Sequence, residues 1–130
     1  MTPSVKAGDK IELTVTPARD VTIRYAGASG DFNPIHLDEE FARSVGLPGR
    51  ILHGLWTMAQ VARAHTEAFG GPASLAALSV SFRGMGVPGV PVTVRGTVRE
   101  VDGDHAVVES EAAQGETRLI RKGRAEIRLR

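Results

Sequence analysis

Hydrophobic and polar residues alternate along the chain with two different periods, which together predict an α+β fold. Residues 10–16, KIELTVT, alternate apolar and polar side chains and predict a strand. Residues 54–69 have helical spacing and predict one long helix, which Gly70-Gly71-Pro72 ends. Five apolar residues of this helix fall near one face: Leu55, Met58, Ala59, Ala62 and Phe69.

The chain beyond residue 72 has the alternation of successive strands. The expected strands are residues 75–83, residues 92–101, residues 105–113 and the last residues of the chain. Residues 84–91, GMGVPGVP, break or bend the chain, and Asp102-Gly103-Asp104 is a good hairpin signal. These elements pack most economically as an antiparallel meander that curves around the long helix. We expect residues 1–130 to form one domain.

Two shorter segments precede the long helix. Residues 19–29 are ambiguous, because three β-branched residues favour a strand whereas the flanking proline and glycines also permit a short helix. Residues 38–44 predict a short helix. Glu39 and Glu40 suit the positive end of its dipole, and Gly46 can end it.

The composition is that of an ordinary globular protein. Hydrophobic residues make up 42% and charged residues 24% of the chain, which favours neither disorder nor a membrane protein. No apolar run approaches the roughly 18 residues of a spanning helix, and the N-terminal residues lack the apolar block of a signal peptide. The absence of cysteine excludes disulfides, thiolate metal sites and cysteine nucleophiles, and it suits a cytoplasmic protein.

The net charge of +1 does not suggest nucleic-acid binding, but the C-terminal residues are locally basic. Glu126 stands there against six basic residues: Arg118, Arg121, Lys122, Arg124, Arg128 and Arg130. One interpretation is the solvated face of a strand. The other is a basic rim for a phosphate-bearing ligand or an acidic carrier protein.

Residues 25–42, YAGASGDFNPIHLDEEFA, carry the strongest chemical signal. Gly30 and Pro34 make this stretch a shaped loop, because neither suits a regular helix or strand here. The loop holds a carboxylate, Asp31, and an imidazole, His36, five residues apart. Such a pair can polarise a water molecule and move protons near neutral pH. Taken singly, Asp31 is equally a turn cap and His36 a partly buried hydrogen-bonding histidine.

Three groups of residues stand out together. They are Tyr25 with Ser29-Gly30-Asp31, Asn33-Pro34-Ile35-His36 and Ala42; His53-Gly54; and Val80-x-Phe82-Arg83 with Val87-Pro88-Gly89. Over about residues 5–130 the chain resembles the MaoC-like hydratases, a family of (R)-specific enoyl-thioester hydratases and dehydratases. The resemblance implies a hot-dog fold, in which a curved sheet wraps one helix. It also implies reversible hydration of trans-2-enoyl thioesters, carried on coenzyme A or acyl carrier protein, to (3R)-3-hydroxyacyl thioesters.

The resemblance also implies roles for single residues. Asp31 and His36 match the catalytic pair of the family, and Gly54 matches the glycine whose backbone N–H binds the thioester oxygen. The other substrate-binding candidates are Asn33, which shapes the loop, His53, which orients it before the helix, and Arg83. Arg83 is either a surface charge or a phosphate contact.

One position departs from the family pattern. Ala62 stands where some bacterial members carry a serine near the substrate, so that hydroxyl contact is lost here. Other residues have simpler interpretations. His65 and His105 are expected at the surface, whereas Trp56 and Phe82 are expected in the core or along an acyl tunnel.

The resemblance implies no metal or redox cofactor. Asp31, His36 and His53 are possible metal ligands by type, but their spacing fits no familiar zinc pattern. We expect at least a dimer, made of two copies or of two different chains, because the family pairs its sheets edge to edge. Neither nucleic acid nor a membrane is an expected partner.

Two other functions stay open. The chain is alternatively a non-catalytic, acyl-binding subunit that depends on a partner chain, although the presence of both Asp31 and His36 argues against this. A hot-dog thioesterase is the other alternative. Such enzymes usually carry their acid on the long helix, where Gln60 and Glu67 are the candidates.

Overall fold

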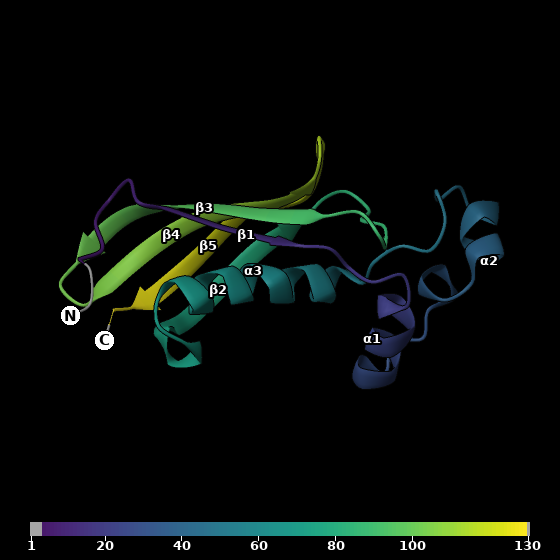
Figure 1. Ribbon diagram of the computed structural model, residues 1–130, viewed down its shortest axis with the longest axis horizontal. Helices are drawn as coiled ribbons and strands as arrows, with labels where there is room; N and C mark the ends of the chain where they lie inside the picture. Colours follow the sequence, from purple (N-terminus) through teal and green to yellow (C-terminus); the bar gives the residue numbers. More distant parts are fainter. Residues whose placement is uncertain (1–3, 130) are drawn as a thin grey trace.

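The computed structural model describes residues 4–129, in which one antiparallel sheet curves around a central helix (Figure 1). The helix is α3 (Gly54–Ala68), and it begins and ends close to the predicted positions. The strands are β1 (Lys10–Val15), β2 (Leu75–Phe82), β3 (Val92–Asp102), β4 (His105–Gln114) and β5 (Thr117–Arg128). The predicted α+β class and the wrapped sheet are therefore confirmed.

The strand order is β1-β3-β4-β5-β2, so the predicted meander holds only for β3, β4 and β5. Two tight turns join these three strands, with Gly103 at φ 64° and Gly115 at φ 58°. The prediction was wrong for β2, which pairs with β5 at the far edge and not with β3, its successor along the chain. The segment after β2 therefore runs back across the end of the sheet before β3 begins.

The side-chain amide of Gln114 makes three hydrogen bonds to that returning segment, in addition to backbone bonds such as the one from Leu52 N–H to the carbonyl oxygen of Gly86. The amide nitrogen of Gln114 donates to the carbonyl oxygens of Val87 (2.8 Å) and Val90 (2.9 Å). Its carbonyl oxygen accepts from the backbone N–H of Val87 at 2.9 Å. The expected break at residues 84–91 is thus a loop tied to the end of β4.

The buried face of α3 differs from the apolar face that the sequence indicates. Its buried residues are Thr57, Val61, Ala64 and His65, which recur at helical spacing. Leu55, which is 60% exposed, and Ala59 face outward. The reason is tertiary: the sheet covers only one stripe of the helix, and that stripe contains two polar residues.

His65 is fully buried, so the expectation of a surface residue was wrong. Its Nδ1 lies 2.7 Å from the carbonyl oxygen of Val61, one turn earlier, and must donate to it. Burial lowers the pKa of His65, because removal from water penalises the charged ring. His65 is therefore a neutral part of the core.

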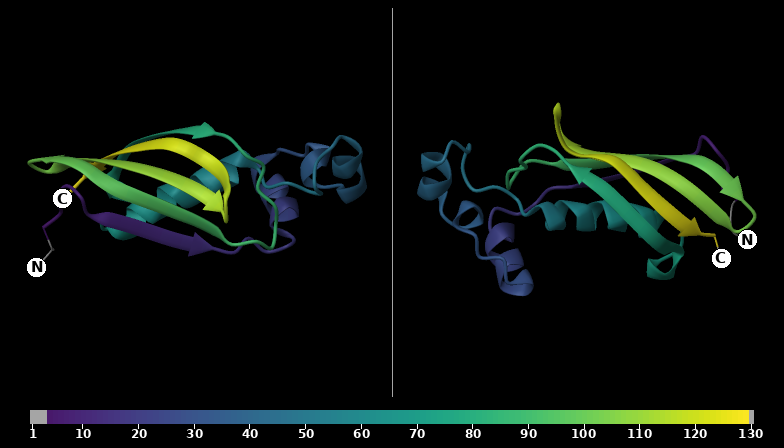
Figure 2. Two further views of the ribbon diagram at one scale, coloured as in Figure 1. Left: turned by 90° about the horizontal axis from the view of Figure 1, so that it is seen from above. Right: turned by 180° about the vertical axis from the view of Figure 1, so that it is seen from behind.

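The ambiguous segment before the candidate loop is a helix, α1 (Val21–Ser29), and the predicted short helix is α2 (Glu39–Ser44). The carboxylate of Asp38 caps α2 by accepting from the N–H of Phe41 at 3.0 Å. Both helices lie beyond one end of the sheet (Figures 1 and 2). They form, with the loop between them, an extension that projects from the N-terminal end of α3.

Arg50 connects the parts of this extension. Its guanidinium donates to the carbonyl oxygen of Arg19 at 3.0 Å, and its backbone N–H donates to the carboxylate of Glu39 at 2.8 Å. That backbone hydrogen bond lowers the pKa of Glu39. Within the described residues, 4–129, no helix has both the length and the apolarity needed to cross a membrane.

Candidate active site

The candidate loop follows α1 and is shaped by two successive turns. In each turn a side-chain oxygen accepts a hydrogen bond from the backbone N–H two residues later. Gly30, at φ 82°, ends α1 in a left-handed conformation. The Oδ1 atom of Asp31 then accepts from the N–H of Asn33 at 3.2 Å, and Oδ1 of Asn33 accepts from the N–H of Ile35 at 3.2 Å. Asn33 thus begins a short 3-10 helix, Pro34–His36, that places His36 back beside Asp31.

The carboxylate of Asp31 and the imidazole of His36 face each other. Oδ2 of Asp31 lies 3.8 Å from Nε2 of His36. The Asp31 side chain is 53% exposed, whereas that of His36 is 9% exposed. A distance of 3.8 Å is too long for a direct hydrogen bond but allows one water oxygen to contact both atoms.

The tautomer of His36 is set by a backbone carbonyl. Nδ1 of His36 lies 2.8 Å from the carbonyl oxygen of Ile51, which can only accept, so Nδ1 carries the proton. The neutral ring therefore presents an unprotonated Nε2 toward Asp31. Ile51 is apolar and took no part in the sequence prediction, because its contribution comes from the backbone and not from its side chain.

His53 completes the group. Its ring stacks on that of His36, with centroids 3.8 Å apart and planes inclined by 20°. Nε2 of His53 lies 3.0 Å from the carbonyl oxygen of Asp31 and donates to it, while Tyr25 packs on the ring at a centroid distance of 4.8 Å. The expected orienting contact between His53 and the loop is therefore present, whereas its other ring nitrogen, Nδ1, is buried without a partner among residues 4–129.

Gly54 follows His53 and is the first residue of α3. Its backbone N–H has no hydrogen-bond acceptor among the described residues, as befits the first turn of a helix. A Cβ atom at this position would lie 3.2 Å from the ring of Phe82. Phe82 is 49% exposed, so it is not the core residue that one interpretation expected.

The remaining candidates are less closely bound to this group. Arg83 follows Phe82, and its exposed side chain pairs with no acidic group in the described part of the chain, so its role stays a prediction. Trp56 is half-buried and packs against the core. Arg130, part of the predicted basic rim, lies outside the described residues.

The three side chains also match a metal-ligand set by type. Potential ligand atoms of Asp31, His36 and His53 all lie within 4.8 Å of one another. Two ring nitrogens, Nδ1 of His36 and Nε2 of His53, are already bound to carbonyl oxygens. A metal would have to use the remaining nitrogens, of which Nδ1 of His53 is fully enclosed, so the group fits a water molecule better than a cation.

Known proteins are similar to this chain over most of its length. Residues 2–119 match the MaoC like domain. The fatty acid synthase subunit beta of Aspergillus oryzae is 42% identical over 112 residues, which are 82% of this chain and 5% of that protein. An enoyl-CoA hydratase of Mycobacterium tuberculosis is 32% identical over 87 residues, 65% of this chain and 29% of that protein. The chain thus spans less than a third of either relative.

A solved structure agrees with these sequence matches. An (R)-hydratase of Pseudomonas aeruginosa has a TM-score of 0.85 and 26% identity, covering 95% of this chain and 81% of that one. The expected hot-dog fold, a sheet wrapped around one long helix, is confirmed by this similarity.

Proposed function

The chain belongs to the MaoC-like family, and from this premise we propose that it hydrates trans-2-enoyl thioesters to (3R)-3-hydroxyacyl thioesters and catalyses the reverse dehydration. The observation that carries the proposal is the 3.8 Å gap between Oδ2 of Asp31 and Nε2 of His36. Both atoms are acceptors when His36 is neutral, so a water molecule between them donates one proton to each. The pair thus orients and activates the nucleophile.

The thioester carbonyl makes this addition feasible, because it withdraws electrons from C3 and holds the developing charge as an enolate. The water oxygen forms a bond to C3 while Asp31 or His36 takes one of its protons. A proton is then delivered to C2 by the pair, so that one water molecule is consumed and the side chains return to their starting state. General acid–base catalysis of this kind contributes about 10²- to 10⁴-fold.

The backbone N–H of Gly54 is the proposed donor to the thioester oxygen. It lies at the positive end of the α3 dipole and has no other acceptor among residues 4–129. A Cβ at this position would lie 3.2 Å from the ring of Phe82, so glycine avoids a close contact beside the N–H. Losing one such donor typically costs about 3 kcal/mol of transition-state stabilisation.

The hydration is redox-neutral, so it requires no redox cofactor, and in this proposal the Asp31–His36 pair activates the water without a metal. The names of the relatives support the substrate class: one is an enoyl-CoA hydratase and another an (R)-hydratase. The fatty acid synthase relative is compatible with a substrate held on a carrier protein, so we propose a thioester of either coenzyme A or acyl carrier protein. The absence of cysteine suits a cytoplasmic protein.

We further propose that two chains pair through β2. This strand, LAALSVSF, is an edge strand without a charge or proline to protect it, whereas the opposite edge, β1, carries Lys10 and Glu12. The exposed side chains of Leu55 and Phe82 add apolar surface near that edge. The partner is a second copy of the chain or a related subunit.

The thioesterase alternative has weaker support. Glu67 is paired with Arg63 on the exposed side of α3, and the amide of Gln60 is 3.4 Å from the carbonyl oxygen of Trp56. Neither residue belongs to the group formed by Asp31 and His36. The other alternative, a non-catalytic acyl-binding subunit that depends on a partner chain, is disfavoured by the presence of both Asp31 and His36.

One assay distinguishes these functions. The purified chain is incubated with crotonyl-CoA, and the conjugated double bond, the 3-hydroxy product and free thiol are followed in parallel. Loss of the double bond with formation of the (3R) product supports the hydratase. Release of thiol without hydration supports the thioesterase, and activity only after addition of a related chain supports the partner-dependent subunit.

A further inference from the structure

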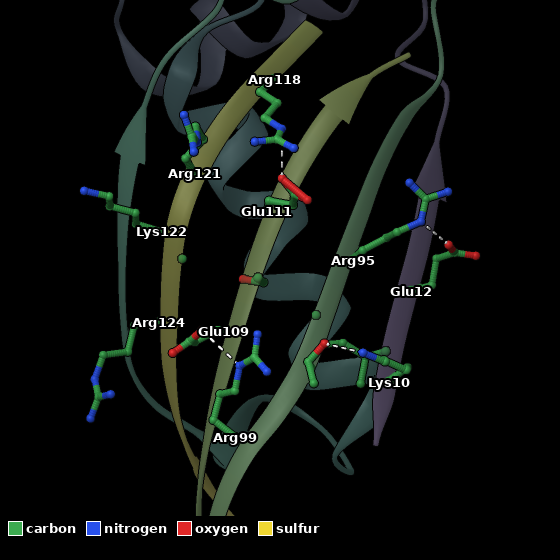
Figure 3. A pocket seen from close by; sticks show the side chains of 15 residues that line it. Lys10, Glu12, Arg95, Arg99, Glu109, Glu111, Arg118, Arg121, Lys122 and Arg124 are labelled. Carbon is green, nitrogen blue, oxygen red and sulfur yellow. Dashed lines mark hydrogen bonds and ion pairs between the residues drawn. The ribbon is translucent and has the colours of Figure 1, made fainter. Parts of the chain in front are cut away.

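The outer face of the sheet, which points away from α3, carries an open hollow of about 940 Å³ (Figure 3). Seven basic side chains line it: Lys10, Arg95, Arg99, Arg118, Arg121, Lys122 and Arg124. Three acidic side chains line it as well: Glu12, Glu109 and Glu111. Because the net charge of the whole chain is only +1, this face concentrates positive charge that the rest of the molecule balances.

The acidic side chains of the hollow are already neutralised by neighbours (Figure 3). Three ion pairs cross the strands: Arg95–Glu12 at 2.7 Å, Arg99–Glu109 at 3.0 Å and Arg118–Glu111 at 3.2 Å. By contrast, no acidic group within residues 4–129 pairs with Arg121, Lys122 or Arg124. The fourth such cation, Lys10 of β1, donates to the hydroxyl of Thr97 at 3.0 Å. Three of the four cations without an acidic partner therefore lie on one short segment of β5.

A bulge in β5 brings these three cations to the same face. Where β2 advances by two residues, β5 advances by three, from Arg124 to Arg121. Lys122 has φ 54°, a left-handed conformation that is uncommon for a residue with a side chain. As a result, the consecutive residues Arg121 and Lys122 are both exposed, whereas a regular strand would turn one of them inward.

We propose that the outer face, centred on Arg121, Lys122 and Arg124, docks an acidic segment of a partner protein. The hollow is open and extends over β1, β3, β4 and β5, so it does not enclose a small molecule. A row of carboxylates on a helix or strand can contact the three cations in succession. Complementary charge of this kind sets the rate and specificity of association.

Other occupants fit this face less well. A second copy of the same face would bring like charges together, which disfavours self-association. Binding of single-stranded nucleic acid usually adds aromatic stacking to phosphate contacts. Among the described residues, none that lines the hollow is aromatic.

The proposed surface is independent of the candidate active site. None of the residues that line the hollow comes from the loop that holds Asp31 and His36, or from α3. The outer face therefore stays free while a thioester occupies the other site. A failed docking experiment would leave the hydratase proposal standing. A failed hydratase assay would likewise leave the docking proposal standing.

The test uses the full chain and poly-L-glutamate as the probe, with binding measured by fluorescence anisotropy at low and at physiological salt. The triple variant Arg121→Gln, Lys122→Gly and Arg124→Gln removes the three charges, and glycine tolerates the left-handed φ at position 122. A matched control, Arg24→Gln with Arg43→Gln and Arg63→Gln, removes the same charge from exposed helical positions elsewhere. Circular dichroism checks that both variants fold.

We expect salt-dependent binding of poly-L-glutamate that weakens at least about tenfold in the triple variant and about twofold or less in the control. Equal binding by the triple variant and the unchanged chain would overturn the proposal, as would no binding at low salt. A parallel titration uses oligothymidylate. If oligothymidylate binds more tightly than poly-L-glutamate and loses affinity in the same variant, the surface binds nucleic acid and the acidic-protein proposal is wrong.

Discussion

The imidazole rings of His36 and His53 are stacked, with centroids 3.8 Å apart, although the two residues are 17 positions apart in the sequence. Each ring has one nitrogen bound to a carbonyl oxygen, of Ile51 and of Asp31 respectively. The hydrogen bond to Ile51 fixes the tautomer of His36, and the stack on His53 helps to fix the orientation of its ring opposite the Asp31 carboxylate.

Asp31→Asn should lower the rate of crotonyl-CoA hydration by about 10²- to 10⁴-fold, because the amide cannot take a proton. His36→Asn should have a similar effect, while its amide nitrogen still donates near the position of Nδ1 to the carbonyl of Ile51. His36→Ala is a poorer test, since it leaves that buried carbonyl unpaired. Steady-state kinetics measure the loss, and near-normal turnover in either asparagine variant would contradict the assigned roles.

His53→Phe should retain the stacked ring but lose the hydrogen bond to the carbonyl oxygen of Asp31. We expect a smaller fall in kcat than for His36→Asn, with KM little changed, because the loop is loosened and no reacting group is lost. The missing hydrogen bond should also reduce the unfolding free energy by about 1 kcal/mol. Kinetics and urea unfolding measure both effects, and unchanged kcat with unchanged stability would exclude a positioning role.

Gly54→Ala should reduce kcat by about 100-fold, because the methyl group crowds the N–H that binds the thioester oxygen. The partly exposed ring of Phe82 can move away from the new Cβ, so the fold should be retained. Arg63→Ala, at an exposed position later in α3, is the control and should keep most of the activity. Activity of Gly54→Ala equal to that of the control would show that this N–H is not the donor.

Stability should fall as the solution is acidified below about pH 6.5, because His65 is buried and neutral. Burial lowers its pKa in the folded state, so the unfolded chain binds more protons there and is favoured at lower pH. His65→Asn should show a shallower pH dependence of the urea midpoint than the unchanged chain. Parallel curves for the unchanged chain and His65→Asn would contradict this explanation.

Chelation should not change the hydration rate. Two of the ring nitrogens near Asp31 are occupied by carbonyl oxygens, and the proposed nucleophile is activated by the Asp31–His36 pair alone. The check is dialysis against EDTA followed by the crotonyl-CoA assay, with added zinc as the comparison. Loss of activity on dialysis and its return with zinc would assign the three-residue group to a metal instead.

Several elements were predictable because neighbouring residues decide them. The N-terminus of α2 depends on the Asp38 cap, and the β3–β4 hairpin depends on Gly103, which takes a positive φ at no steric cost. The loop at Asp31 also depends on contacts within a few residues, through the side chains of Asp31 and Asn33. Such contacts join residues that are close in the sequence, so they can be predicted from it.

Other features needed contacts between distant segments. The β-branched start of α1 favoured a strand locally, yet this segment is a helix beyond the end of the sheet, where Arg50 bonds to the carbonyl oxygen of Arg19. His65 looked like a surface residue because it is polar, but the sheet covers the helical stripe that contains it. The outward position of Lys122 depends on a bulge that no spacing in the sequence predicts.

The sequence by itself determined the alternation of strands, the extent of the long helix and the presence of an acid and a histidine in one shaped loop. Periodicity and turn chemistry act over a few residues, so they can be recognised in one dimension. The tertiary structure decided that β2 pairs with β5, which face of α3 is buried, and that a carbonyl from residue 51 orients His36. These outcomes depend on which surfaces meet after the chain has folded, and burial then overrides local preference.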